Sequence, residues 1–74
     1  MPHIGNLIKQ ELERQERTPT WLARKINCQP PNIYYIFRQH SINTDLLMQI
    51  SHALHVDFFR FYSAEYSHTE GDTV

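Results

Sequence analysis

The first segment of the chain places apolar side chains at the three- and four-residue spacing of an amphipathic helix. Charged and amide residues separate these positions, so the apolar side chains would fall on one helical face. The pattern predicts a helix over about residues 4–15. Its apolar positions are Ile4, Leu7, Ile8 and Leu12.

The segment TPTWLARKIN carries the signals of a second helix, over residues 18–26. Thr18 can accept a hydrogen bond from one of the first free amides, and Pro19 suits the first helical position, where no amide donor is missed. Asn27 is expected to end this helix, because asparagine tolerates the left-handed backbone conformation found at helix C-termini. The expected buried side consists of Leu22, Ala23 and Ile26.

A third helix, over residues 30–39, is predicted within the stretch NCQPPNIYYIFRQH. Two adjacent prolines would break a helix interior, but in the first turn they remove only amide donors that lack an intrahelical partner. Ile33, Ile36 and Phe37 share one face and are expected to be buried. The side chains expected in solvent are Pro31, Asn32, Tyr34, Tyr35, Arg38 and Gln39.

Two further helices are predicted after the polar connection HSIN. Asn43 can cap a helix over residues 44–54. Asp57 can cap a short helix over residues 57–62. From 63 to 74 the chain has little apolar content, which favours a mobile polar tail. The residues expected against the core are Leu46, Leu47, Ile50, Ala53 and Leu54, with Phe58, Phe59 and Tyr62 covering it.

The length of 74 residues indicates a single all-α domain with a small core. One cysteine, Cys28, excludes an intramolecular disulfide framework and fits a reducing compartment. The N-terminus lacks the pattern of a signal peptide, and no apolar stretch approaches the length of about 18 residues that a membrane span requires. We therefore expect a soluble, cytoplasmic protein without contact to a membrane.

Catalytic and metal chemistry are not indicated. The chain has no glycine-rich phosphate loop, and a helical domain of this size has little room to exclude water from a reaction. His52 and His55 lie three residues apart on a predicted helix, but two further metal ligands are lacking. We expect no enzyme activity, no metal, no cofactor and no small-molecule substrate.

Charge is unevenly distributed along the chain, although the formal net charge is only −1. Residues 17–40 hold four cations and no Asp or Glu, whereas the acidic residues lie on either side of this window. A local excess of this kind attracts an anionic partner, and a solvated basic surface without a function is the open alternative. The four cations are Arg17, Arg24, Lys25 and Arg38.

The very short NCQ turn, with apolar anchors in the helices on both sides, resembles the helix-turn-helix of the lambda-repressor-like, XRE family. The resemblance covers about residues 4–62, and it implies a compact five-helix DNA-binding domain over residues 1–62 with its recognition helix at 30–39. It implies base-edge contacts from Gln29, Pro31, Asn32, Tyr34 and Tyr35. Together with the cations of the basic window, the expected phosphate contacts come from Arg17, Thr18, Arg24, Lys25, Arg38, Gln39, His40, Ser41 and Asn43.

Four positions depart from the pattern of that family. Pro19 stands where members often carry a phosphate-binding glutamine, and proline has no donor. Asn27 and Gln39 replace the usual glycines, and Phe37 replaces an acidic residue. These changes preserve the predicted helices but alter the expected contacts to the DNA backbone.

The residue types of the third helix suit recognition of a DNA duplex. Cations displace condensed counterions and supply affinity, while amides such as Asn32 can pair with an adenine edge and Tyr35 can contact a thymine methyl group. For Asn32 and Gln29 the alternative role is to cap the helix start. For Tyr34 and Tyr35 it is an ordinary surface position or a protein contact. The sequence predicts a transcriptional regulator that binds specific double-stranded DNA.

A single recognition helix covers only a few base pairs, so a homodimer is expected at least on DNA. The alternative function is a protein-binding accessory or antitoxin-like module that has the same fold and does not bind DNA. Pro19 and the near-neutral net charge favour this alternative. Candidate residues for a dimer surface are Trp21, Phe59, Phe61 and Tyr62.

Overall fold

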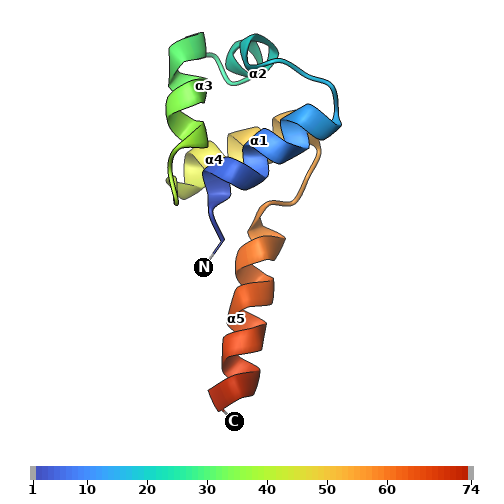
Figure 1. Cartoon of the computed structure of the whole chain (residues 1–74), viewed down its shortest axis with the longest axis vertical. Helices are drawn as coiled ribbons and strands as arrows, with labels where there is room; N and C mark the ends of the chain where they lie inside the picture. The colour runs from blue at the N-terminus through green and yellow to red at the C-terminus, as the bar shows by residue number, and fades with distance from the viewer. Residues whose placement is uncertain (1, 74) are drawn as a thin grey trace.

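The computed structural model describes the backbone of residues 2–73 and the side chains of residues 2–67. Within this range the chain is all-α, as predicted, with five helices and no strand (Figure 1). The first four helices end within two residues of their predicted bounds. The helices are α1 (Ile4–Arg14), α2 (Pro19–Lys25), α3 (Pro30–Phe37), α4 (Thr44–Leu54) and α5 (Phe59–Thr73).

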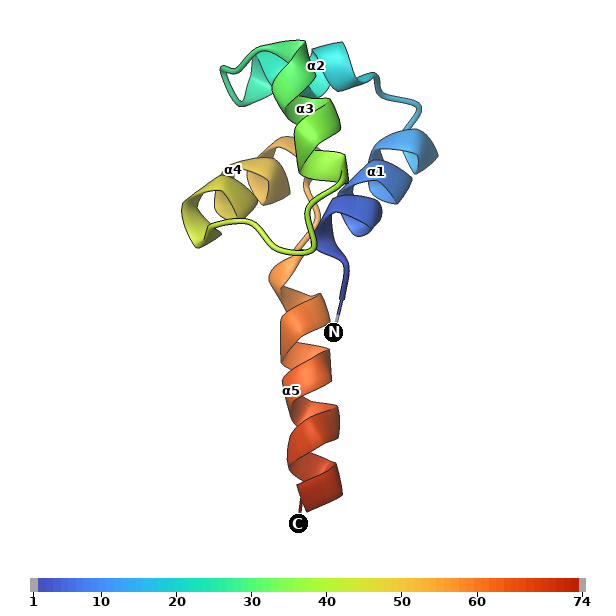
Figure 2. The same ribbon diagram turned by 60° about the vertical axis from the view of Figure 1, so that its left-hand side comes forward.

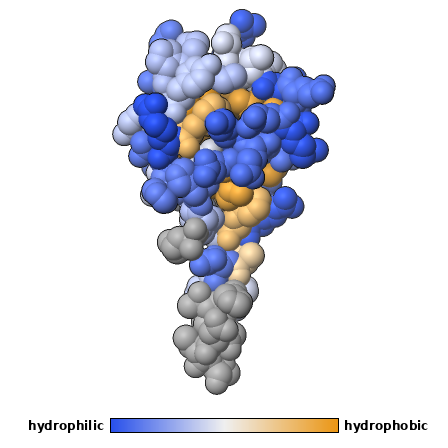
Figure 3. All heavy atoms as spheres, viewed as in Figure 1, coloured by the Kyte–Doolittle hydropathy of each residue, from blue (hydrophilic) through white to orange (hydrophobic). Residues whose placement is uncertain are grey.

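The first four helices form one body around a common core, and α5 leads away from it (Figures 1 and 2). Within the body, α3 packs against both α1 and α2, and α2 also contacts α4. In Figure 3 apolar side chains show between polar ones on the body and at the start of α5. The buried apolar residues are Ile4, Ile8, Leu12, Leu22, Ala23, Ile26, Ile33, Ile36, Leu47, Ile50, Leu54 and Phe58.

Three residues that were expected in the core lie at its edge instead. Phe37, Leu46 and Ala53 pack against the buried cluster but stay partly exposed. The reason is geometric. A helical face that holds four or five apolar residues is wider than so small a core can cover, so the residues at the edges of the face stay partly exposed.

The predicted side-chain caps at the starts of α2 and α4 are confirmed. The backbone amide of Trp21 donates to Thr18 Oγ1 at 3.0 Å, and that of Leu46 donates to Asn43 Oδ1 at 2.7 Å. Each cap satisfies an amide that has no partner inside its own helix. The starts of these helices are therefore fixed by local sequence.

Left-handed backbone conformations end three of the helices. Asn27 has φ 58° after α2, as predicted, and His55 has φ 56° after α4. Glu16 adopts φ 58° after α1, which the sequence did not indicate, because glutamate has no particular preference for this conformation. At each of these residues the chain turns sharply towards the next helix.

The start of α1 is bonded to the end of α3. The amides of Ile4 and Gly5 donate to the carbonyls of His40 and Gln39 at 3.0 and 2.9 Å. A Cβ atom at position 5 would overlap the carbonyl oxygens of Ile36 and Phe37 and would lie 2.7 Å from that of Gln39. Glycine is thus required at position 5, and the loop after α3 supplies partners for two free amides of α1.

His3 adds a side-chain contact to the same junction. Its Nδ1 accepts a hydrogen bond from the amide of Asn6 at 3.1 Å and so caps α1. Its ring lies against that of His40, with 4.2 Å between centroids and the planes tilted by 52°. His3 thus links the start of α1 to the loop after α3.

The last helix differs most from its prediction. The sequence predicted a helix over 57–62 followed by a tail, whereas α5 begins at Phe59 and continues through Thr73. The prediction ended where apolar periodicity ends, but periodicity reports packing against a core and not helix formation itself. No proline interrupts this segment, and the side chains of 68–74 lie outside the described part of the chain.

Candidate nucleic-acid interface

The α2–α3 unit is joined by a four-residue turn, Ile26 to Gln29. After Asn27 reverses the chain, the amide of Cys28 donates to the carbonyl of Ala23 at 2.9 Å. This bond closes the end of α2 and sets the direction in which α3 starts. Leu22 and Ile33, both fully buried, pack the two helices into the same core.

The N-cap residue of α3 does not use its side chain to cap the helix. Gln29 has an extended backbone and its side chain makes no hydrogen bond to the helix start. Pro30 and Pro31 in the first turn leave few amides that need a partner there. The capping role considered for Gln29 is therefore wrong, and its exposed amide is open to another partner.

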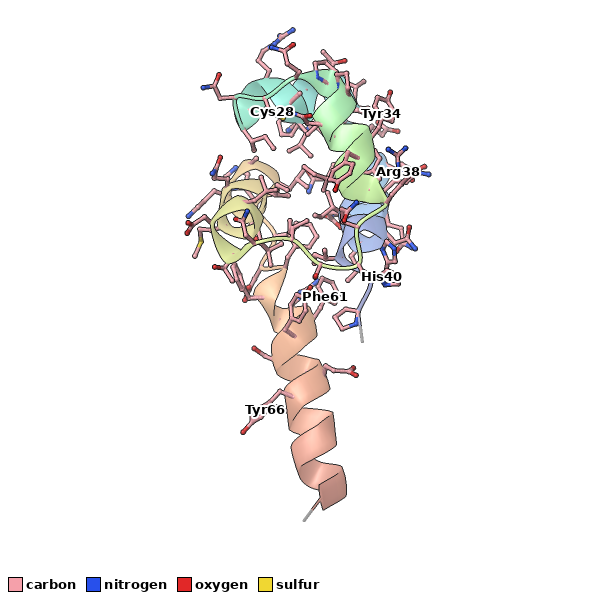
Figure 4. All side chains as sticks on the ribbon, turned by 90° about the vertical axis from the view of Figure 1, so that its left-hand side faces the viewer. Cys28, Tyr34, Arg38, His40, Phe61 and Tyr66 are labelled. Carbon is pink, nitrogen blue, oxygen red and sulfur yellow. The ribbon has the colours of Figure 1, made fainter. Side chains whose placement is uncertain are left out.

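The outer face of α3 carries large, exposed side chains. Tyr34 and Tyr35 are 54% and 58% exposed, and Pro31, Asn32 and Arg38 are exposed as well. Figure 4 shows Tyr34 and Arg38 pointing away from the helical body. Gln29 is exposed too, so all the residues that were expected to contact bases lie in solvent.

A groove of about 380 Å³ runs between α3 and the start of α4. Its floor is apolar and its rim carries neutral polar groups from α3 and from the loop that follows. No Asp, Glu, Lys or Arg lines it. The rim consists of Asn32, Tyr35, Gln39, Ser41 and Asn43, and the floor includes Ile26, Ile36, Ile42 and Leu46.

The two tyrosines of α3 lie on different sides of the helix. Tyr35 lines the groove next to α4, whereas Tyr34 stacks edge-on against Phe37, with 6.0 Å between centroids. Tyr34 also borders a second groove, between α1 and α3, together with Lys9 and Arg17. The structure therefore brings Tyr35 together with Asn32 and separates both from Tyr34.

The four cations of the basic window fall into two groups, one beside α3 and one around the Trp21 ring. Arg24 lies in a shallow groove with Asn27 and Pro30, beside the first turn of α3. Arg38 follows the last turn of α3. Neither makes a salt bridge within the described residues, so both charges are available to an anion next to α3.

The other two cations of the window are engaged by an aromatic ring. The guanidinium of Arg17 lies 4.2 Å from the centroid of the Trp21 ring, and the ammonium of Lys25 lies 5.6 Å from it. Lys25 also borders a groove formed with the far half of α4, through Gln49 and His52. Trp21 thus gathers Arg17 and Lys25 around itself, away from the groove beside Tyr35.

Two of the expected phosphate-contacting residues already use an oxygen for helix capping. Thr18 Oγ1 and Asn43 Oδ1 each accept a backbone amide. The hydroxyl hydrogen of Thr18 and the Nδ2 group of Asn43 remain as donors. His40 and Ser41 are exposed in the connection between α3 and α4, and Gln39 Nε2 makes a long 3.5 Å hydrogen bond to the carbonyl of Tyr35.

Cys28 is half-buried in the floor of the groove beside α3. Burial raises the pKa of its thiol, because the low-dielectric surroundings disfavour the thiolate. The side chain therefore serves as a small apolar residue near the turn.

Two general features of the described residues bear on function. No three His, Cys, Asp or Glu side chains among them lie close enough together to hold a metal ion. None of the helices over the same range is long and apolar enough to cross a membrane.

Two features of the site were missed from the sequence. The contact of Lys25 with Trp21 was signalled by their i, i+4 spacing within one helix, whereas Arg17 reaches the same ring from the segment before the helix. The close approach of α1 and α3 was signalled by Gly5, since a glycine inside an otherwise amphipathic helix often marks a close backbone contact.

Comparisons of this chain with models of protein families, with curated proteins and with solved structures find no match. The resemblance to a helix-turn-helix family therefore stays a prediction from the sequence.

Proposed function

We propose that this chain binds double-stranded DNA, with α3 in the major groove and α2 beside the backbone. The observation that carries the proposal is the rim of the groove along α3. There Asn32 and Tyr35 lie with Gln39, Ser41 and Asn43, so groups able to contact base edges and groups able to contact phosphates share one surface.

The dimensions and charge of α3 support this proposal. A helix with its side chains is about 10–12 Å across, and the major groove is about 12 Å wide. Arg24 and Arg38 stand near the two ends of α3, where the sugar–phosphate strands on either side of the groove would pass. No carboxylate occurs in residues 17–40 to repel those strands.

Binding of labelled duplex DNA by the full chain at two salt concentrations tests the proposal. A random pool of duplexes supplies the first probe, and selection from that pool supplies a specific one. We expect affinity to fall steeply as salt rises, because bound cations release counterions from the DNA. Absence of binding, or binding that salt does not change, would refute the proposal.

Two matched cations sharpen this test. Arg38→Ala should weaken binding to all sequences and lower the salt slope by about 1. Lys25→Ala removes the same charge from the Trp21 side, so it should change both quantities much less. Equal losses from the two variants would show that affinity follows net charge and not the surface of α3.

Two matched tyrosines address base readout. Tyr35→Ala and Asn32→Ala should relax discrimination between sequences at a cost of about 1–3 kcal/mol for the preferred site. Tyr34→Ala removes a ring of nearly equal exposure on the α1 side of the helix and should leave discrimination intact. A larger loss of discrimination from Tyr34→Ala would place the readout surface on the other side of α3.

A protein-binding role is the second candidate, and one observation favours it. Two adjacent tyrosines, each more than half exposed, cover the outer face of α3, and tyrosine is enriched at protein interfaces. Purification of the chain with a stoichiometric partner that protects Tyr34 and Tyr35, together with no affinity for DNA, would establish this function in place of DNA binding.

A further inference from the structure

The α3–α4 groove, which is the groove of about 380 Å³ between α3 and the start of α4, lies on a side of α3 that no other helix covers closely. The helix α3 packs against α1 and α2, and α4 packs against α2, whereas α3 and α4 make little direct contact. The loop over residues 38–43 connects them (Figure 2). Both walls of the groove are thus held in place by contacts with α1 and α2, as a preformed binding site requires.

The floor of the α3–α4 groove leaves apolar surface in contact with solvent. Ile42 and Leu46 both line it and stay partly exposed. Leu46 was expected in the core, and its place beside the groove accounts for its exposure. A ligand with an apolar body would remove this surface from water, which is favourable in proportion to the area that it covers.

The rim of the α3–α4 groove offers uncharged amide and hydroxyl groups to a ligand. Its members are Asn32, Tyr35, Gln39, Ser41 and Asn43. No hydrogen bond among the described residues engages the side chain of Asn32, Tyr35 or Ser41. Asn43 keeps its Nδ2 group, since only its Oδ1 atom caps α4. A ligand that carries an amide or a hydroxyl group would therefore find several donors and acceptors at once.

Charge and size limit which ligands the α3–α4 groove can hold. No Asp, Glu, Lys or Arg lines it, so an ion would lose its water there without gaining a counter-charge, which costs far more than burying an uncharged group. Its volume lies within the range of about 300–1,000 Å³ that is typical of small-molecule sites. The Tyr35 ring on its wall favours an aromatic ligand, because two rings attract each other beyond the area that they bury. The groove therefore suits a small, uncharged aromatic molecule.

We infer that the α3–α4 groove is a regulatory site, which binds a small uncharged aromatic molecule and, when it is occupied, releases DNA from α3. The release follows because the ligand occupies the rim on which Asn32 and Tyr35 would contact bases. This second step rests on the proposed function, whereas binding of the ligand does not. Since the coupling between two ligands is reciprocal, bound DNA weakens the binding of the molecule by the same factor.

Titration of the full, isotope-labelled chain with benzamide, followed by the NMR shifts of backbone amides, tests the site. Benzamide joins an aromatic ring to an uncharged amide, and benzoate has the same size and shape but carries a charge. We expect benzamide to shift the amides of Cys28 and Leu46 saturably and to bind at least about tenfold more tightly than benzoate. No saturable shift, equal binding of benzoate, or shifts centred on the groove between Leu47 and Phe59 would overturn the inference.

Two substitutions of Cys28, in the floor of the groove, form a matched pair. Cys28→Leu fills part of the space and should weaken the binding of benzamide about tenfold or more, whereas Cys28→Ala removes the thiol, leaves the space open and should bind as the parent chain does. Urea denaturation checks that each variant folds. Equal loss of binding from both variants would contradict a site defined by its open space. If Cys28→Leu does not fold, Cys28→Ala and the comparison of benzamide with benzoate decide the question.

Competition between benzamide and the duplex selected from the random pool tests the regulatory step. At about ten times the Kd of benzamide, the affinity for the duplex should fall about tenfold, because DNA then binds only the unoccupied chains. Cys28→Leu should keep its affinity for the duplex and lose the response to benzamide. An unchanged affinity of the parent chain for DNA would overturn the regulatory step. If benzamide binds but the chain has no affinity for DNA at either salt concentration, the proposed function fails and the ligand site stands.

Discussion

The helices α3 and α5 carry tyrosines of similar exposure but are held in place in different ways. Tyr34 and Tyr35 stand on a helix that α1 and α2 support from two sides, and Tyr66 stands on a helix that leaves the body after its first turns. An exposed ring on α3 therefore has a fixed position relative to Arg24 and Arg38. An exposed ring on α5 gains a fixed position only when something packs against it.

This difference separates two kinds of surface. Recognition of a rigid duplex requires side chains held in register, which the bonds between α1 and the end of α3 provide. A helix that stands clear of the core, as the outer part of α5 does, gains such register only when something packs against it. Substitutions at the α1–α3 junction should disturb the surface of α3, and substitutions of the exposed tyrosines compare α3 with α5 directly.

The largest effect is expected from Gly5→Ala. The added Cβ meets three backbone carbonyls of the α3 end, which cannot move as a flexible side chain would. We expect a loss of about 3–4 kcal/mol in the free energy of unfolding, measured by urea denaturation, and displacement of α3. Asn6→Ala, at the next and exposed position, is the control and should change stability by about 0.5 kcal/mol or less. If Gly5→Ala left the free energy of unfolding unchanged, the close approach of α1 and α3 would be contradicted.

A smaller loss is expected from His3→Ala, which removes the cap of α1 and its contact with the His40 ring. Removal of an N-cap side chain costs about 1 kcal/mol. His3→Asn keeps an accepting oxygen for the amide of Asn6 and should recover most of this loss. Equal destabilisation by both substitutions in urea denaturation would show that the ring stack, and not the cap, holds the junction.

Acid titration tests the opposite end of α1. Hydrogen bonds from Arg14 and Gln15 lower the pKa of Glu11 from 4.5 to about 2. Gln15 also donates to the carbonyl of Leu54 at 2.8 Å and so ties α1 to α4. Since the pKa is lower in the folded state, this contribution is complete above about pH 4.5 and is lost as the pH falls towards 2.

The expected size of this acid effect is about 1 kcal/mol, as for ion pairs close to solvent. Glu11→Gln should flatten the fall in stability between pH 5 and 2, measured by thermal unfolding at each pH. An unchanged pH profile in this variant would assign the acid sensitivity to another carboxylate.

The smallest effect on stability is expected from Tyr35→Ala and Tyr66→Ala. Both rings are more than half exposed, so each variant should unfold within about 0.5 kcal/mol of the parent chain. Tyr35→Ala should lose sequence discrimination on DNA, whereas Tyr66→Ala should keep it. A loss of discrimination from Tyr66→Ala would show that the surfaces of α3 and α5 are not separate.

Much of the body could be predicted because its signals are local. Thr18 and Asn43 cap helices as expected, and Asn27 adopts the left-handed conformation that was assigned to it. Each of these features depends on a side chain and a backbone group within three residues. The predicted bounds of the last helix were wrong for the same reason, since the low apolar content after Tyr62 removed the local signal without preventing the helix.

The candidate site could be predicted only in part. Exposure of Asn32 and Tyr35 follows from the periodicity of α3, and both are exposed. Which grooves Tyr34 and Tyr35 border depends on where α1 and α4 lie around α3. These are contacts between residues far apart in the sequence, and periodicity carries no information about them.

The sequence by itself determined which segments form α1 to α4, where they begin, and which faces they bury, because caps, prolines and apolar spacing act over one or two turns. The tertiary structure alone decided which cations flank α3, why position 5 must be glycine, and that α5 leaves the body with Tyr66 exposed. Those outcomes depend on the crossing of whole helices, which is set by the fit of one packed surface against another.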